Sequence, residues 1–213
     1  MSLRPPPRGR SGKRSAEGEA LVDADPDETA VAGFDATASD GRAAVTVAIP
    51  ERIENPTPAD YLSVMSRAVF QAGLSWKLIE SKWDGYLRLF DDFDPAQVAR
   101  YGEADIERIL ADGAVVRTRK KILATIENAK TLLALEREHG SLRAYLRSFG
   151  GYAALVADLR TRFKFLGELS AYYFLFRTGE PVPRFEDWEK TIPGDHPRMR
   201  DMVAHARQRG WQG

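Results

Sequence analysis

Residues 93–129 decide the fold class, and they read FDPAQVARYGEADIERILADGAVVRTRKKILATIENA. Asp94 followed by Pro95 is typical of a helix N-cap and first helical position. Apolar residues then recur three or four positions apart, and the pattern is interrupted at Gly113. The stretch predicts a short helix over 104–110, a glycine turn, and a long helix over about 118–139.

The flanking sequence repeats these signals. Residues 57–60 (TPAD) combine an N-cap hydroxyl, a proline and an acid in the first turn, and Ser75 caps a second predicted helix. Further helices are predicted over 141–149, 151–159 and 167–176, and no convincing set of paired strands is present. We therefore predict an all-α fold.

The ends of the chain differ from the middle. The first 14 residues carry five basic residues and no acid, whereas residues 15–40 carry eight acids and no base, with few large apolar side chains. Such a segment buries too little apolar surface to offset its conformational entropy. We predict a disordered extension over 1–48, a helical domain over 49–192, and a C-terminal tail over 193–213 compatible with a helix. The basic arm is interpreted as solvated, with contact to DNA phosphates as the alternative.

Composition narrows the possible functions. The sequence has 213 residues, 31 basic against 31 acidic side chains, three histidines and no cysteine. Without cysteine the sequence has no disulfide, thiolate zinc site, iron–sulfur cluster or cysteine nucleophile. The balanced charge means that nucleic-acid binding requires a local basic face. The apolar run at 169–176 (LSAYYFLF) is too short for a membrane span, which needs ~20 residues.

The glycine turn is the first candidate for chemistry. A short helix, a hairpin at Gly113 and a long helix with a basic start resemble a helix-hairpin-helix unit. Backbone N–H groups at a helix start favour an anion, and basic side chains beside them contact phosphates without reading sequence. The candidate DNA-binding residues are Gly113, Arg117, Arg119, Lys120 and Lys121. A solvated basic face remains the alternative.

A second candidate is the break between helices at residues 70–76 (FQAGLSW). An enzyme that acts on a base in DNA extrudes it, stacks it on an aromatic face and fills the gap in the duplex. Trp76 is the candidate base-binding residue, and Gln71 and Leu74 are candidates for the gap. The alternative is that Leu74 and Trp76 belong to the core.

Three segments in order resemble the DNA-3-methyladenine glycosylase I family: QAGLSW at 71–76, residues 93–129, and RFKFLG at 162–167. The resemblance covers about residues 57–180. It implies an all-helical fold of the helix-hairpin-helix glycosylase superfamily and hydrolysis of the N-glycosidic bond of 3-methyladenine in DNA. Trp76 matches the family's base-stacking tryptophan, and Gln71 and Leu74 match positions that approach the gap.

The sequence also departs from this family. The family's base-contacting glutamate corresponds to Ala68, and its N-terminal Tyr-His-Asp and Trp-Gly pattern is missing before residue 57. The family's zinc is held by two cysteines and two histidines, whereas this sequence has no cysteine and only His139, His196 and His205, at other spacings. We expect no metal and no cofactor, with the termini held by packing through Trp188 or left loose.

The missing glutamate does not exclude catalysis, because an N3-alkylated purine is cationic and leaves readily. Glu80 is a weak candidate for a replacement carboxylate, one helical turn beyond Trp76; an ordinary exposed glutamate is the alternative. We expect a DNA-3-methyladenine glycosylase-like protein of base-excision repair. It would act as a cytoplasmic monomer on double-stranded DNA with an alkylated base, and without a membrane partner. The alternatives are a non-catalytic helix-hairpin-helix DNA-binding module and a helical protein-interaction domain.

Overall fold

The computed structural model describes residues 49–211. Residues 1–48 and 212–213, and with them the predicted disordered extension, lie outside the described residues. The described part is helical and contains no strand, as the sequence predicts. No helix in this part is long and apolar enough to cross a bilayer. The elements are α1 (Pro58–Gln71), α2 (Trp76–Ser81), α3 (Trp83–Leu89), η2 (Asp91–Phe93), α4 (Pro95–Val98), α5 (Glu103–Ala111), α6 (Arg119–His139), α7 (Leu142–Leu146), α8 (Tyr152–Arg162), α9 (Glu168–Arg177), α10 (Phe185–Trp188), η3 (Glu189–Thr191) and α11 (Pro197–Gln208).

Local capping chemistry begins several helices where the sequence predicts them. The Thr57 hydroxyl accepts from the Asp60 backbone N–H, and the Asp60 carboxylate accepts from the Thr57 N–H, which completes a capping box at α1. The Asp94 carboxylate accepts from the Ala96 N–H at α4. Ser75 caps α2 by accepting from the N–H three residues on. These helix starts are therefore encoded within four residues of sequence.

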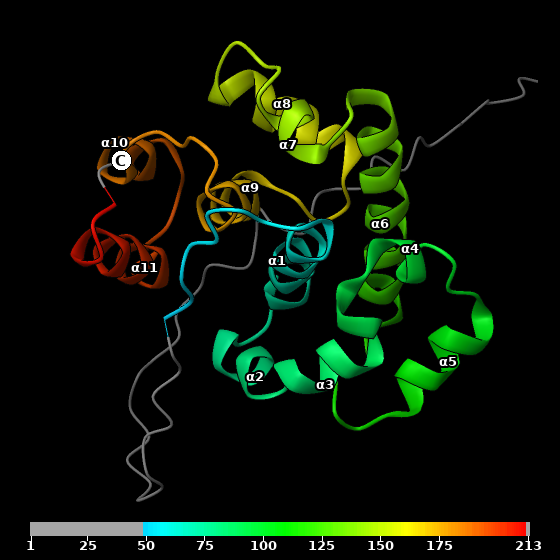
Figure 1. Cartoon of the computed structure of the whole chain (residues 1–213). Coiled ribbons are helices and arrows are strands. Elements are labelled where there is room, and N and C mark those ends of the chain that lie inside the picture. Colours follow the sequence, from blue (N-terminus) through cyan, green and yellow to red (C-terminus); the bar gives the residue numbers. More distant parts are fainter. Residues whose placement is uncertain (1–48, 212–213) are drawn as a thin grey trace, which may run out of the picture.

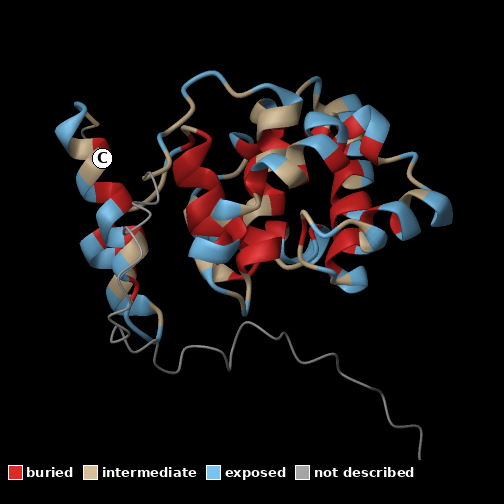
Figure 2. Cartoon of the chain, turned by 90° about the horizontal axis from the view of Figure 1, so that it is seen from below, coloured by how far each residue is buried: buried red, intermediate tan, exposed pale blue. Residues whose placement is uncertain are grey.

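Helix α1 lies at the centre of the fold and packs against both α6 and α9 (Figure 1). Its apolar side chains are almost fully buried, with Leu62, Met65 and Phe70 at 0% exposure. Figure 2 shows the buried residues on these inner helices and exposed residues on the outer faces. In Figure 1, α2, α3 and α5 follow one edge of the molecule and α7 and α8 the opposite edge.

The helix predicted after Ser75 is divided at Lys82 into α2 and α3, and a left-handed turn follows it. Asp91, Asp92 and Phe93 all have positive φ, between 49° and 58°. Left-handed backbone costs roughly 1–2 kcal/mol per residue outside glycine. The ring of Phe93 is fully buried and stacks on Trp83 with a centroid separation of 5.2 Å. Aromatic packing thus offsets the backbone cost and fixes the approach to α4.

The C-terminal segment folds as α11 and is joined to the start of the described chain by packing. The Arg52 guanidinium lies 5.2 Å from the Phe176 ring centroid and 4.8 Å from that of Trp211. Trp211 and Phe176 meet edge to face at 5.0 Å, and Arg209 pairs with Glu51 at 3.1 Å. We call Arg52, Phe176 and Trp211 the terminal clasp.

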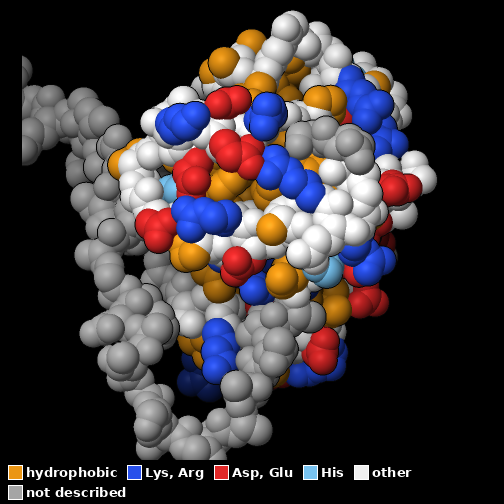
Figure 3. Space-filling model, turned by 90° about the vertical axis from the view of Figure 1, so that its left-hand side faces the viewer, with side chains coloured by type: hydrophobic (Ala, Val, Ile, Leu, Met, Phe, Trp, Pro, Cys, Tyr) orange, Lys and Arg blue, Asp and Glu red, His pale blue; other side chains and the backbone are white. Residues whose placement is uncertain are grey.

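The outer face of this region mixes both charges. Figure 3 shows acidic and basic side chains beside one another on the side of the molecule where α10 and α11 lie. Arg207 of α11 pairs with Glu186 of α10, and Arg200 pairs with Glu189 of η3. Trp188 stacks on Tyr172 with a centroid separation of 3.9 Å, so it holds α10 against α9. These contacts hold α11 against α10 and η3, and α10 against α9.

Candidate nucleic-acid interface

The turn between α1 and α2 presents the residues of the QAGLSW segment. Gly73 has a φ of +66°, a backbone conformation that glycine adopts without strain. The Leu74 N–H donates to the Gln71 carbonyl at 3.0 Å and closes the turn. Gly73 and Ser75 are exposed, whereas Leu74 is half-buried and packs against the core. The backbone therefore comes close to the surface at Gly73.

Lys121 is buried beneath this turn and hydrogen-bonds to its backbone instead of facing solvent. Its Nζ donates to the carbonyls of Phe70 at 3.0 Å and Ala72 at 2.5 Å, and the residue is only 7% exposed. Burial lowers the pKa of Lys121 to about 8. The sequence placed Lys121 among the phosphate-contacting residues, whereas in the structure its ammonium group is bonded to carbonyls at the end of α1.

A polar cluster lies beside the turn, formed by Arg67, Gln71 and Glu80. Gln71 is 3% exposed, and its Nε2 donates to Glu80 Oε1 at 2.9 Å. The second Glu80 oxygen accepts from Arg67, whose guanidinium lies 4.1 Å from the Trp83 ring centroid. The Glu80 side chain is 12% exposed, so it is not the ordinary surface glutamate that was the alternative. Gln71 points inward and does not face a gap in DNA as it lies here.

Trp76 occupies an intermediate position between core and surface. It is half-buried and meets Tyr173 of α9 edge to face, with ring centroids 5.4 Å apart and planes at 86°. Tyr173 is 1% exposed and accepts from Arg177 at 2.9 Å. Trp76 therefore keeps part of its surface accessible, which stacking on a base requires. Ala68, the position of the family glutamate, is 6% exposed and belongs to the core.

The helix-hairpin-helix pattern is present as α5, residues 112–118 and α6. The exposed Gly113 offers its carbonyl to Lys82 Nζ at 2.8 Å, and the Val116 N–H donates to the Tyr86 hydroxyl at 3.0 Å. A Cβ on Gly85 would lie 2.7 Å from the Ala114 Cβ, so glycine at 85 permits α3 to approach the hairpin closely. The hairpin is thereby fixed against α3, the helix that follows α2.

The basic residues at the start of α6 have different environments. Arg119 pairs with Glu103 at 2.5 Å and with Glu107 at 2.7 Å. Two carboxylates of α5 therefore compensate its positive charge. Arg117 and Lys120 are exposed, and neither forms a close ion pair among residues 49–211, although the charge of Arg117 helps to lower the pKa of Asp112. Thr118 makes no side-chain cap to α6. Of the basic residues predicted to contact phosphate, Arg117 and Lys120 are the ones accessible to an external anion, together with the uncapped N–H groups of α6.

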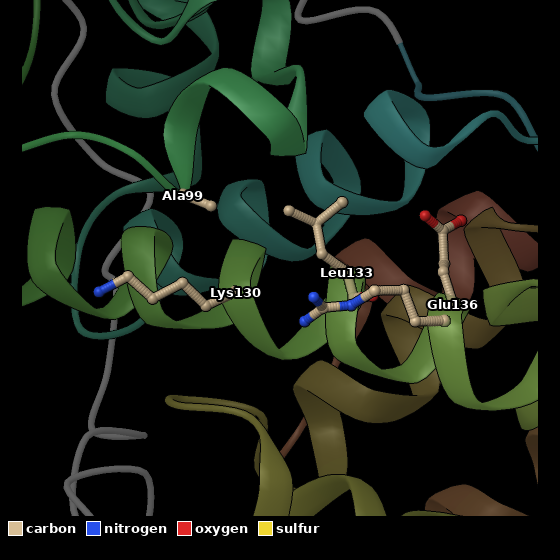
Figure 4. A pocket seen from close by; sticks show the side chains of 5 residues that line it. Ala99, Lys130, Leu133 and Glu136 are labelled. Atoms are coloured by element: carbon tan, nitrogen blue, oxygen red, sulfur yellow. The ribbon is translucent and has the colours of Figure 1, made fainter.

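A hollow of about 460 Å³ lies on another part of α6 (Figure 4). Figure 4 shows Ala99 facing a row of α6 side chains, Lys130, Leu133 and Glu136. This hollow shares no residue with the turn or the hairpin, so it is not part of the candidate interface.

The described residues do not fit the zinc site of the resembled family. No three histidine, cysteine, aspartate or glutamate side chains in residues 49–211 come together to hold a metal. His139 lies 3.6 Å from Glu138 and packs on Tyr145, and His196 bonds to the Pro193 carbonyl at 3.0 Å. His139 and His196 thus have local partners instead of lying together at a metal site.

Two neighbours of Trp76 and Glu80 were missed by the sequence analysis. Arg67 lies one helical turn before Gln71, a spacing that could have indicated a shared face. Tyr173 sits inside the apolar run of α9, far along the chain from Trp76, and no local pattern indicates their contact. Phe165 was also unassigned, although it lies in the RFKFLG segment.

Together the helical fold, the turn and the hairpin define a DNA-glycosylase-type helical domain, and comparisons agree. A crystal structure of a Tyr-to-Phe variant of 3-methyladenine DNA glycosylase I in complex with 3-methyladenine superposes with a TM-score of 0.54 at 25% identity. The superposition covers 70% of this chain and 91% of the chain in that crystal structure. The model of the methyladenine glycosylase family matches residues 59–164. The chain belongs to this family.

Two curated relatives are similar in sequence. DNA-3-methyladenine glycosylase 1 of Escherichia coli (strain K12) is 36% identical over 91 residues, which are 43% of this chain and 49% of that protein. DNA-3-methyladenine glycosylase of Haemophilus influenzae is 28% identical over 130 residues, 51% of this chain and 70% of that protein. The match therefore spans about half the length of the Escherichia coli protein.

Proposed function

We propose that this protein is a DNA-3-methyladenine glycosylase of base-excision repair, acting on double-stranded DNA as a cytoplasmic monomer. One observation carries the proposal: Lys121 of α6 bonds to the carbonyls of Phe70 and Ala72 at the end of α1. The turn that bears Trp76 and the helix that bears the basic hairpin are thus one rigid unit. A phosphate-binding protein needs the hairpin alone, whereas base flipping needs both.

The names of the relatives and the solved complex with 3-methyladenine support that base as the substrate. In this proposal Trp76 stacks on the flipped purine, and Leu74 with the exposed Gly73 fills the vacated position. Arg117, Lys120 and the start of α6 hold the phosphates. Gln71 acts indirectly, by binding Glu80 beside Trp76.

The chemistry is the hydrolysis of a bond that is already weak. The bond between C1′ of deoxyribose and N9 of the purine breaks, and its electron pair leaves with the base and neutralises the cationic ring. Water supplies the hydroxyl that bonds to C1′ and releases a proton. Both oxygens of Glu80 are engaged by Gln71 and Arg67, so Glu80 is poorly placed to serve as general base. Flipping, stacking and exclusion of water then provide most of the catalysis.

The test is release of free base from duplex DNA treated with a methylating agent. We expect the parent protein to release 3-methyladenine, and Trp76→Ala to release much less at the same protein concentration. Glu80→Gln is the matched control, and it should retain most of the activity because its amide still accepts from Arg67. A folded parent protein that binds DNA without releasing base would contradict the proposal.

A further inference from the structure

Phe165 has a backbone conformation that a phenylalanine adopts only under constraint. Its φ is +57°, and it is one of four non-glycine residues in the described part with positive φ. The other three form the aromatic-packed turn at 91–93. Left-handed residues with a bulky side chain are disfavoured and tend to occur where the surroundings impose them.

The constraint comes from Asn128 of α6. Its side chain is 1% exposed, its Oδ1 accepts from the Lys164 N–H at 2.7 Å, and its Nδ2 donates to the Lys164 carbonyl at 3.1 Å. Both polar groups of the residue before Phe165 are therefore fixed to α6. A buried amide with two such bonds holds the segment in one conformation.

The constraint turns the Phe165 ring away from the core. Its neighbours Phe163 and Leu166 are buried at 3% and 2% exposure, whereas Phe165 is half-buried and outside the hydrophobic core. The Nζ of Lys120 lies 5.6 Å from the centroid of its ring. An aromatic side chain held outward at a cost in backbone strain points to a role in binding.

The position of the ring connects it to the candidate interface. Lys120 is exposed at the start of α6 and forms no close ion pair among residues 49–211, and the next residue, Lys121, holds the turn before Trp76. The segment containing Phe165 also leads into α9, which carries Tyr173 beneath Trp76. The ring thus lies at the same end of α6 as the hairpin and the turn.

We propose that Phe165 is a further DNA-contacting residue, whose ring packs on a sugar or an unstacked base beside the flipped nucleotide. Lys120 at the ring then contacts the adjacent phosphate. This inference rests on the proposed function. Aromatic rings contribute to the binding of unstacked nucleotides whatever the base, whereas regular duplex offers them little surface. Phe165 should therefore favour distorted DNA over intact duplex.

The test is Phe165→Gly, measured with two duplexes that differ only in a tetrahydrofuran abasic analogue at one position. Glycine adopts a positive φ freely, so the melting temperature should stay equal or rise. Affinity for the abasic duplex should fall roughly 5- to 150-fold, the range for one stacking contact, and affinity for the intact duplex should change little. Phe165→Tyr should restore most of the affinity.

Phe149→Ala is the matched control, since Phe149 is also half-buried but packs on Tyr145 of α7 instead of lying beside Lys120. It should leave both affinities unchanged. A lower melting temperature for Phe165→Gly, with equal weakening on both duplexes, would assign the ring to structure and overturn the inference. The inference would also be overturned if the parent protein binds the abasic duplex and Phe165→Gly binds it with the same affinity. A parent that binds neither duplex would overturn the proposed function and this inference with it.

Discussion

At the scale of single residues, the candidate site depends on which side-chain groups are already engaged in contacts within the protein. Gln71 and Glu80 bind each other beside Trp76, and Arg67 completes the cluster. Within this cluster, the Gln71 Oε1 atom is the one buried side-chain atom that has no hydrogen-bond partner in the described part of the chain. Trp76 differs from these residues because it is a half-buried aromatic side chain that meets Tyr173 edge to face. It is therefore the residue of this group with surface left for a base.

Trp76→Ala and Trp83→Ala should separate binding from folding. Trp76 is half-buried, so its loss should cost ~1–3 kcal/mol of binding to DNA with an extrahelical base and little binding to intact duplex. Trp83 is 6% exposed and stacks on Tyr86 and Phe93, so its loss should destabilise the fold by ~3–5 kcal/mol. Denaturant unfolding and two binding titrations on each variant check this. Equal loss of stability in both variants would make Trp76 a core residue.

At the scale of elements, the hairpin and the helices beside it decide which cations reach DNA. α5 supplies Glu103 and Glu107 to Arg119, and α1 supplies two carbonyl oxygens to Lys121. A positive charge at the start of a helix is repelled by the helix dipole. The acceptors on α5 and α1 offset this repulsion for Arg119 and Lys121. Arg117 and Lys120 remain for an external anion.

The salt dependence of DNA binding should distinguish these cations. Arg117→Ala and Lys120→Ala should each reduce the slope of log affinity against log salt concentration by ~0.9, with similar weakening for every DNA sequence. Arg119→Ala should leave the slope nearly unchanged, because its charge is already compensated by two glutamates. Binding titrations between 50 and 200 mM salt, the range in which such slopes are commonly read, measure this. A large change for Arg119→Ala alone would show that its ion pairs open on DNA.

At the scale of the whole molecule, the ends of the described chain meet through aromatic and cationic packing. The terminal clasp brings Arg52, Phe176 and Trp211 together, and burial lowers the pKa of Arg52. The Arg177 side chain donates to the Glu51 carbonyl at 2.7 Å and continues this connection into α9. The clasp thus joins the segment before α1 to α9 and α11, a task for which the described residues offer no zinc ligand set.

Loss of the clasp should lower stability, and loss of metal should not. Trp211→Ala removes two cation–π contacts, from Arg52 and Arg207, and one edge-to-face contact with the ring of Phe176, together on the order of 1–3 kcal/mol. Adding a chelator should leave the melting temperature of the parent protein unchanged, since a structural metal would otherwise contribute to folding. Thermal unfolding of both proteins with and without chelator tests both statements. A chelator-dependent melting temperature would reveal a metal site.

The sequence by itself determined the helical class of the fold and where several helices begin. Capping residues such as Thr57, Asp94 and Ser75 act on backbone groups within four residues, so their effect is readable locally. Only the tertiary structure decided the state of each polar side chain. Lys121, Arg119 and Gln71 resemble surface residues in sequence, yet their partners lie on other helices or beyond a turn. The outward ring of Phe165 likewise depends on Asn128. Burial and pairing arise from contacts between distant segments, and local sequence does not encode them.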